Sequence, residues 1–94
     1  MALFILNHER DNVVTALTPM EAGEALHLEN SGLHGITLKE YIPFAHKCAI
    51  REIRRGETVI KYGESIGVAT CDIEPGQHVH IHNLRSIRGT VGDK

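Results

Sequence analysis

The sequence predicts a mostly β fold in a single small domain. Short runs of β-branched and apolar residues alternate with glycine-containing turns along the chain, and no stretch of about 11 residues keeps helical periodicity. A chain of 94 residues forms one domain with a modest core. We therefore expect about seven to nine short strands, folded as bent hairpins, in one domain over residues 1–94, with residues 85–94 as a polar tail.

Composition and charge exclude several classes of protein. With a net charge of -2 and 4% aromatic residues, the chain lacks the basic surface and the stacking rings of a nucleic-acid-binding domain. No apolar run approaches the ~20 residues of a membrane span, and the apolar start is too short for a signal peptide. Cys48 and Cys71 have no metal-binding spacing, so we expect reduced thiols in a cytoplasmic protein, with a single disulfide as the alternative.

Turn-forming residues divide the chain into the expected strands. In order, these are residues 3–7, residues 12–17, a hairpin over 28–38 that turns at 30–32, residues 46–50, and a strand–turn–strand over 59–69. A short helix capped by Asp11 or Asn12 is the alternative for the second run. His27 and His34 border the hairpin and are expected at the surface.

A short pattern occurs three times along the chain, over residues 17–26, 50–59 and 70–79. Each copy has an apolar residue three positions before a glycine, then Glu or Gln, then an apolar residue three positions after the glycine. The pattern predicts a one-turn helix or a tight turn that inserts its apolar residue into the core. The glycine supplies a left-handed backbone from which a strand begins.

A run of alternating histidines near the C-terminal end is the most distinctive feature of the sequence. Successive residues of a strand point to opposite faces, so His78, His80 and His82 would share one face, roughly 6–7 Å apart. Val79 and Ile81 would then face the core. Histidine is the usual transition-metal ligand and the proton carrier near neutral pH, so the shared face predicts a metal or anion site; a solvated polar face is the alternative.

Two further pairs of polar residues are candidates for a site. His46 and Lys47 enter an otherwise apolar run, so one of them should face a ligand or the solvent. His8 and Asp11 form a polar pair at the end of the first expected strand, where a simple turn hydrogen bond is the alternative.

Five strings, taken in order, resemble the SAF domain of the altronate/galactarate dehydratase family. They are HERDNV (8–13), IPFAHKCAI (42–50), GETVIKYG (56–63), IG (66–67) and GQHVHIHN (76–83). The resemblance covers residues from about 8 to 84, and Ala45 stands where the family usually has a glycine before the histidine. It implies a β-clip fold, which is a small barrel-like assembly of bent hairpins.

The resemblance also implies an activity and a partner. In this family the domain is either the N-terminal part of a larger dehydratase or the small subunit of a two-component lyase, so it implies a large catalytic subunit as partner. The reaction implied is removal of water from an acidic sugar with a divalent metal, commonly iron(II). The alternatives are elimination of sulfite from (2R)-sulfolactate and a non-catalytic module for carbohydrate binding or assembly.

Elimination β to a carboxylate gives each candidate residue an expected role. The reaction needs a base for the α-proton, help for the leaving group, and positive charge near the enolate-like intermediate. We expect metal ligands at His78, His80 and His82, and catalytic groups at His46, Lys47, His8 and Asp11. A chain this small has little room for a closed pocket, so we expect a site shared with the large subunit and no activity in the isolated chain; a homo-oligomer is compatible with the sequence.

Overall fold

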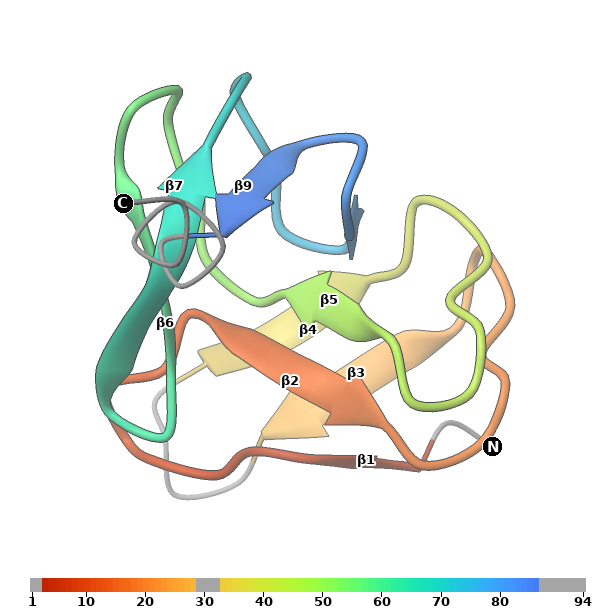
Figure 1. The fold of residues 1–94 in the computed structure, drawn as a ribbon. Coiled ribbons are helices and arrows are strands. Elements are labelled where there is room, and N and C mark those ends of the chain that lie inside the picture. The colour runs from red at the N-terminus through yellow and green to blue at the C-terminus, as the bar shows by residue number, and fades with distance from the viewer. Residues whose placement is uncertain (1–2, 29–32, 87–94) are drawn as a thin grey trace.

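The computed structural model describes residues 3–28 and 33–86, and within them the chain forms nine short strands in three antiparallel sheets (Figure 1). The strands are β1 (Phe4–Ile5), β2 (Val13–Ala16), β3 (Ala25–Leu28), β4 (Leu33–Thr37), β5 (Lys47–Ala49), β6 (Thr58–Lys61), β7 (Glu64–Ala69), β8 (His78–Val79) and β9 (Leu84–Ser86). One sheet has the order β1-β2-β5-β8, the second pairs β3 with β4, and the third has the order β6-β7-β9. The prediction of a mostly β fold is confirmed.

Most strands lie where the sequence predicted them. The second expected strand is β2, so the alternative of a capped helix is wrong there, and the hairpin over 28–38 is the β3–β4 pair. The turn of that hairpin and residues 87–94 lie outside the described residues. The polar tail was expected to begin at Arg85, but Arg85 and Ser86 belong to β9, which pairs with β7. No helix in the described ranges is long and apolar enough to cross a membrane.

Because successive residues of a strand point to opposite faces, the four-stranded sheet contributes residues to two core clusters, one on each face. Val14 and Cys48 face a cluster that includes residues of β3 and β4, whereas Val13 and Ala49 face one that includes residues of β6, β7 and β8. Cys48 is buried and free, and Cys71 is exposed and free. The sheet that carries β5 and β8 is therefore held in place from both sides.

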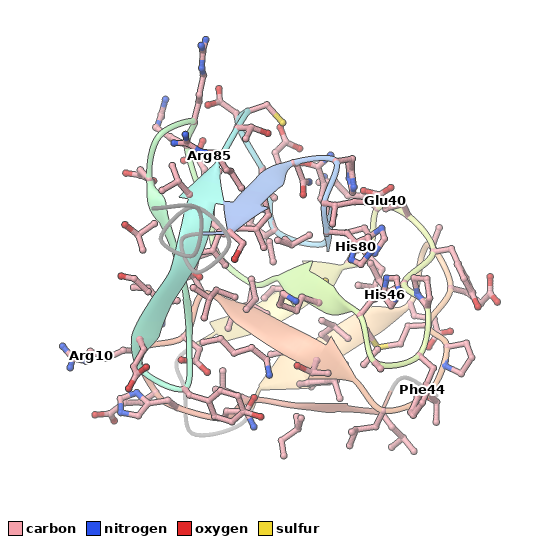
Figure 2. All side chains as sticks on the ribbon, viewed as in Figure 1. Arg10, Glu40, Phe44, His46, His80 and Arg85 are labelled. Carbon is pink, nitrogen blue, oxygen red and sulfur yellow. The ribbon has the colours of Figure 1, made fainter. Side chains whose placement is uncertain are left out.

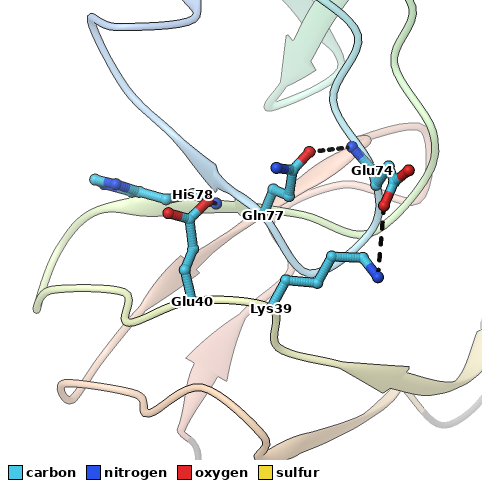
Figure 3. Close-up of polar contacts among 5 residues, drawn as sticks. All are labelled: Lys39, Glu40, Glu74, Gln77 and His78. Carbon is cyan, nitrogen blue, oxygen red and sulfur yellow. Dashed lines mark hydrogen bonds and ion pairs between the residues drawn. The ribbon is translucent and has the colours of Figure 1, made fainter.

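All three copies of the repeated pattern form the same tight turn, which we call the capped turn. In each, the glycine has a φ of 89–94°, and the apolar residue three positions before it is buried. The Glu or Gln after the glycine caps the turn, because its side chain accepts a hydrogen bond from the amide three residues earlier. These bonds join Glu21 to Glu24, Arg54 to Glu57, and Glu74 to Gln77, at 2.7–2.9 Å. Figure 3 shows the bond between Glu74 and Gln77. The expected tight turn is confirmed, and the alternative of a one-turn helix is wrong because none of the residues in these three turns is helical.

A fourth turn with the same backbone shape, but without the side-chain cap, occupies residues 42–46. Ile42 is buried and forms an isolated β-bridge with Met20, as Ile53 does with Ile73. The amide of His46 donates to the carbonyl of Pro43 at 3.0 Å, the same backbone bond that closes the other three turns. Ala45 takes the place of the glycine with a φ of 70°, so this copy does not contain the glycine that defines the sequence pattern.

Candidate functional site

Three imidazoles meet beside the ends of β5 and β8. Nδ1 of His46 lies 2.9 Å from Nε2 of His78, and one ring nitrogen from each of His46, His78 and His80 lies within 4.8 Å of the others. The rings of His46 and His80 stack at 4.3 Å between centroids, and Figure 2 shows the two side by side. We call these three residues the imidazole cluster.

Antiparallel pairing of β5 with β8 brings residues that are far apart in the sequence into the imidazole cluster. Cys48 is the pairing partner of His78, so His46, two residues before Cys48, lies beside the histidine run. His82 lies at the margin, because its ring is tilted by 42° to that of His78, whereas the rings of His46, His78 and His80 are stacked with interplanar angles of 10–26°. The structure therefore groups His46 with His78 and His80 more tightly than it groups His82.

The histidine run is not one continuous strand, as the sequence had suggested. The strand β8 ends at Val79 because the buried Asn83 holds the next four residues in a turn. Its side chain accepts a hydrogen bond from the amide of His80 at 2.9 Å and donates one to the carbonyl of His78 at 2.8 Å. Val79 is buried as expected, but Ile81 is at the turn and 84% exposed, so its expected place in the core is wrong.

His46 is free to join the imidazole cluster because its turn needs no cap. In the three capped turns, the side chain at the position of His46 accepts a hydrogen bond from a backbone amide three residues earlier. Pro43 occupies that earlier position here, and proline has no amide hydrogen to donate. The imidazole of His46 can therefore turn toward His78 without leaving a polar backbone group unpaired.

His8 and Asp11 lie at the opposite end of β2 from the imidazole cluster. Asp11 precedes the start of β2, whereas Ala16 at its end donates a backbone hydrogen bond to the carbonyl of His46, a separation of about 15 Å along an extended chain. The carboxylate of Asp11 is fully buried and accepts hydrogen bonds from the amides of Tyr62 and Gly63, at 3.0 and 2.8 Å.

His8 completes the same turn region. Its Nδ1 accepts a hydrogen bond from the amide of Arg10 at 3.0 Å, and its ring lies against Gly63. The expected grouping of His8 and Asp11 with the other candidates is therefore wrong, because both residues hold the β6–β7 turn against the start of β2.

Residues 2–87 match the family described as altronate/galactarate dehydratase SAF domain. The chain belongs to this family. The altronate dehydratase of Bacillus subtilis (strain 168) is 38% identical over 86 residues, which cover 92% of this chain and 17% of that protein. The altronate dehydratase of Escherichia coli (strain K12) is 40% identical over 83 residues, which cover 88% and 16%. This SAF domain thus spans about a sixth of the length of these two relatives.

A third relative matches over nearly its whole length. The subunit alpha of (2R)-sulfolactate sulfo-lyase from Chromohalobacter salexigens is 34% identical over 93 residues, which cover 94% of this SAF domain and 99% of that subunit. The corresponding subunit of Paracoccus pantotrophus is 47% identical over 53 residues. A domain of this family therefore also occurs as a separate subunit of about this size.

The electrostatic surroundings of the SAF domain's imidazole cluster favour neutral rings. Burial lowers the pKa of His78, and the neighbouring imidazoles of His46, His82 and His80 lower it further. Glu40 acts in the opposite direction, and its carboxylate accepts a hydrogen bond from the amide of His78 at 3.0 Å (Figure 3). Burial, His46 and Lys47 also lower the pKa of His80. Neutral imidazole is the form that binds metals.

The imidazole cluster could hold a metal ion. Two nitrogens about 2.1 Å from a common ion in tetrahedral geometry are about 3.4 Å apart. The 2.9 Å between the nitrogens of His46 and His78 is that of a hydrogen bond between the two rings, so these nitrogens would separate by about 0.5 Å to share an ion. Three imidazole donors suit zinc, copper, iron or nickel. Three ligands leave coordination positions open, as a catalytic metal site requires.

Lys47 is a partly buried cation on the opposite face of the sheet from His78, and its positive charge acts on His80 of the cluster. It is the first residue of β5, where it pairs with Thr15 of β2 and Val79 of β8. Burial lowers the pKa of Lys47, and the positive charge of Lys61 lowers it further. No carboxylate of the described residues forms an ion pair with Lys47, so a bound anion would find an uncompensated positive charge there.

Proposed function

We propose that this chain is the small, alpha-type subunit of a two-subunit lyase that eliminates sulfite from (2R)-sulfolactate. The observation that carries the proposal is the match over 99% of the sulfo-lyase subunit alpha from Chromohalobacter salexigens. The altronate dehydratases match with somewhat higher identity, but over only 16–17% of their length. Dehydration of an acidic sugar such as altronate or galactarate, our first expectation from the sequence, is the second candidate for the same site.

The proposed reaction is a β-elimination. A base removes the proton from the carbon next to the carboxylate, and the electron pair of that C–H bond forms a carbon–carbon double bond. The C–S bond breaks with its electron pair on sulfur, which leaves as sulfite. The resulting enol takes up a proton on carbon and loses the proton of its hydroxyl group, which gives a 2-oxo acid.

The residues of this chain would contribute positive charge and metal ligands to that reaction. Lys47 lacks an acidic partner among the described residues, so it would bind the carboxylate or the sulfonate of the substrate and stabilise the developing enolate. His46, His78 and His80 would hold a divalent metal, which we propose to be iron(II). Such an ion supplies Lewis-acid stabilisation of negative charge on oxygen. The imidazole cluster has no carboxylate ligand, and we propose that the large subunit completes the site.

Reconstitution tests the proposal. The chain is purified alone and together with the large subunit of its own organism, loaded anaerobically with iron(II), and supplied with (2R)-sulfolactate, altronate or galactarate. We expect release of sulfite from sulfolactate only when both subunits are present. Turnover of altronate or galactarate without any of sulfolactate would replace the proposal by the hydro-lyase candidate. Full turnover by the large subunit alone would show that this chain is an accessory module.

A further inference from the structure

Two large apolar side chains protrude beside the imidazole cluster. Seven large apolar or aromatic residues of the described ranges are exposed, and they are Leu3, Ile5, Leu17, Tyr41, Phe44, Tyr62 and Ile81. Ile81 is 84% exposed and directly follows His80, while Phe44 is 62% exposed and stands two residues before His46. The rings of these two histidines stack on each other, so Phe44 and Ile81 flank the same site.

The fold holds Phe44 in an exposed position. It stands at the tip of the fourth turn, where the capped turns carry Ala22, Arg55 and Pro75. Backbone hydrogen bonds fix both sides of this tip, from Ala45 to Ala16 and from His46 to Pro43. A non-glycine residue with a φ of 70° costs of order 1–2 kcal/mol, and such strain is found at functional sites. The turn therefore presents a large apolar ring to solvent on a rigid and strained support.

Ile81 is presented with the same rigidity. It lies inside the turn that the buried Asn83 closes through three hydrogen bonds of 2.8–3.0 Å, two to the backbone of His80 and one to that of His78. A side chain on a fixed backbone loses little conformational entropy when a partner covers it. A single exposed apolar residue is common on protein surfaces, so it is the position of Ile81 next to His80 of the imidazole cluster that suits it to a contact with a partner at that site.

The apolar surface continues from Phe44 toward β1. Ala16 accepts the backbone hydrogen bond of Ala45, and Leu17, the next residue, donates its own to the carbonyl of Leu3. Leu17 is exposed, and it follows Ala16 in the chain just as Phe44 precedes Ala45, so the hydrogen bond between Ala45 and Ala16 brings their backbones to adjacent segments. We call Leu17, Phe44 and Ile81 the docking face.

We propose that the docking face binds an apolar surface of the large lyase subunit, which thereby closes over the imidazole cluster. This inference rests on the proposed function, which requires a large subunit at that site. The occupant is inferred from continuity, because Phe44 and Ile81 adjoin the histidines of the site that, under the proposed function, the large subunit completes. Covering these side chains would also remove water from the cluster and strengthen the electrostatic interactions within it.

The test is a binding experiment with a matched control. The double variant Phe44→Ser/Ile81→Ser and the single variant Tyr62→Ser are compared with the wild type for their affinity for the large subunit. Tyr62 is as exposed as Phe44, at 63%, but lies at the turn held by Asp11. Loss of buried apolar anchors weakens association by a factor of ten or more per hot spot. We therefore expect at least about tenfold weaker binding for the double variant and wild-type binding for Tyr62→Ser.

Three measurements separate the possible failures. Thermal unfolding of each isolated variant, followed by far-UV circular dichroism, shows that the exposed substitutions leave the fold intact. Binding of the double variant with wild-type affinity would overturn the docking face while leaving the proposed function in place. A wild-type chain that binds no large subunit would overturn the proposed function itself. A wild-type dimer that becomes monomeric in the double variant, with unchanged affinity for the large subunit, would assign the face to a second copy of this chain.

Discussion

Substitution of Asp11 by alanine separates a structural role for this carboxylate from the catalytic role that the sequence suggested. Asp11 is fully buried, and its two oxygens accept hydrogen bonds from the amides of Tyr62 and Gly63. Asp11→Ala would leave both amides without a partner at the tight turn between β6 and β7. We expect loss of stability, and no change in the imidazole cluster at the other end of β2.

The size of the loss follows from these two bonds. A hydrogen bond to a charged group contributes about 1.5–3 kcal/mol net, so the pair is worth about 3–6 kcal/mol. Small domains have a total stability of about 5–15 kcal/mol. With a shift of roughly 4–8 °C per kcal/mol for a domain of this size, we expect the melting temperature of Asp11→Ala to fall by at least about 12 °C.

Thermal unfolding measures the fall in melting temperature and urea unfolding measures the loss in free energy. Both are followed by far-UV circular dichroism, since the chain contains no tryptophan. Asp72→Ala is the matched control, because the exposed carboxylate of Asp72 accepts one hydrogen bond, from the amide of Arg55 at 2.8 Å. We expect the control to lose about 1 kcal/mol or less. An Asp11→Ala chain as stable as the control, or one that is fully folded but inactive in the reconstituted enzyme, would refute the structural assignment of Asp11.

Three further predictions concern the cluster and the core. His78→Ala should weaken the binding of zinc(II) to the chain by at least about 100-fold in titration calorimetry, whereas the exposed His27→Ala should not change it. Pro43→Ala restores an amide that the ring of His46 can cap, and such a bond is worth about 0.5–1.5 kcal/mol, so zinc affinity should fall about threefold to tenfold. Pro75→Ala, at the partly buried tip of an equivalent turn, should leave zinc affinity unchanged. Burial raises the pKa of Cys48 to about 12 in the folded state, whereas the thiol of the unfolded chain ionises from about pH 9. Ionisation therefore favours the unfolded state between about pH 9 and pH 12, and the folded state loses stability over that range. The stability advantage of the wild type over Cys48→Ala should therefore shrink by about 2 kcal/mol between pH 7 and pH 10.5 in urea unfolding; a constant difference would contradict this.

The strands could be predicted from the sequence because each depends on local signals. Runs of β-branched residues between turn formers located β2, β5, β6 and β7, and the glycine pattern located three turns. Contacts that join distant segments could not be predicted in this way. Asp11 binds amides 51 and 52 residues further along the chain, and no local pattern indicates that pairing.

The histidine run shows where a periodicity argument fails. Alternation correctly brought His78 and His80 to one site, but the backbone there is a turn in which the side chain of Asn83 replaces strand pairing. A side-chain hydrogen bond of this kind competes with the strand ladder, and alternation contains no information about it. The same bond moved Ile81 from its expected place in the core to the surface.

The position of His46 shows how one turn serves both the fold and the site. Three capped turns use the residue at this position to satisfy a backbone amide, and that residue is Glu24, Glu57 or Gln77. In the fourth turn, Pro43 removes the amide that would need satisfying, and the residue that follows the left-handed position is a histidine whose ring nitrogen lies 2.9 Å from that of His78. A side chain that caps its own turn by a hydrogen bond cannot at the same time bind a metal ion. The departure from the pattern at Pro43 is therefore what makes the imidazole of His46 available, and chains with a non-proline residue there and a histidine three residues later should show weaker metal binding.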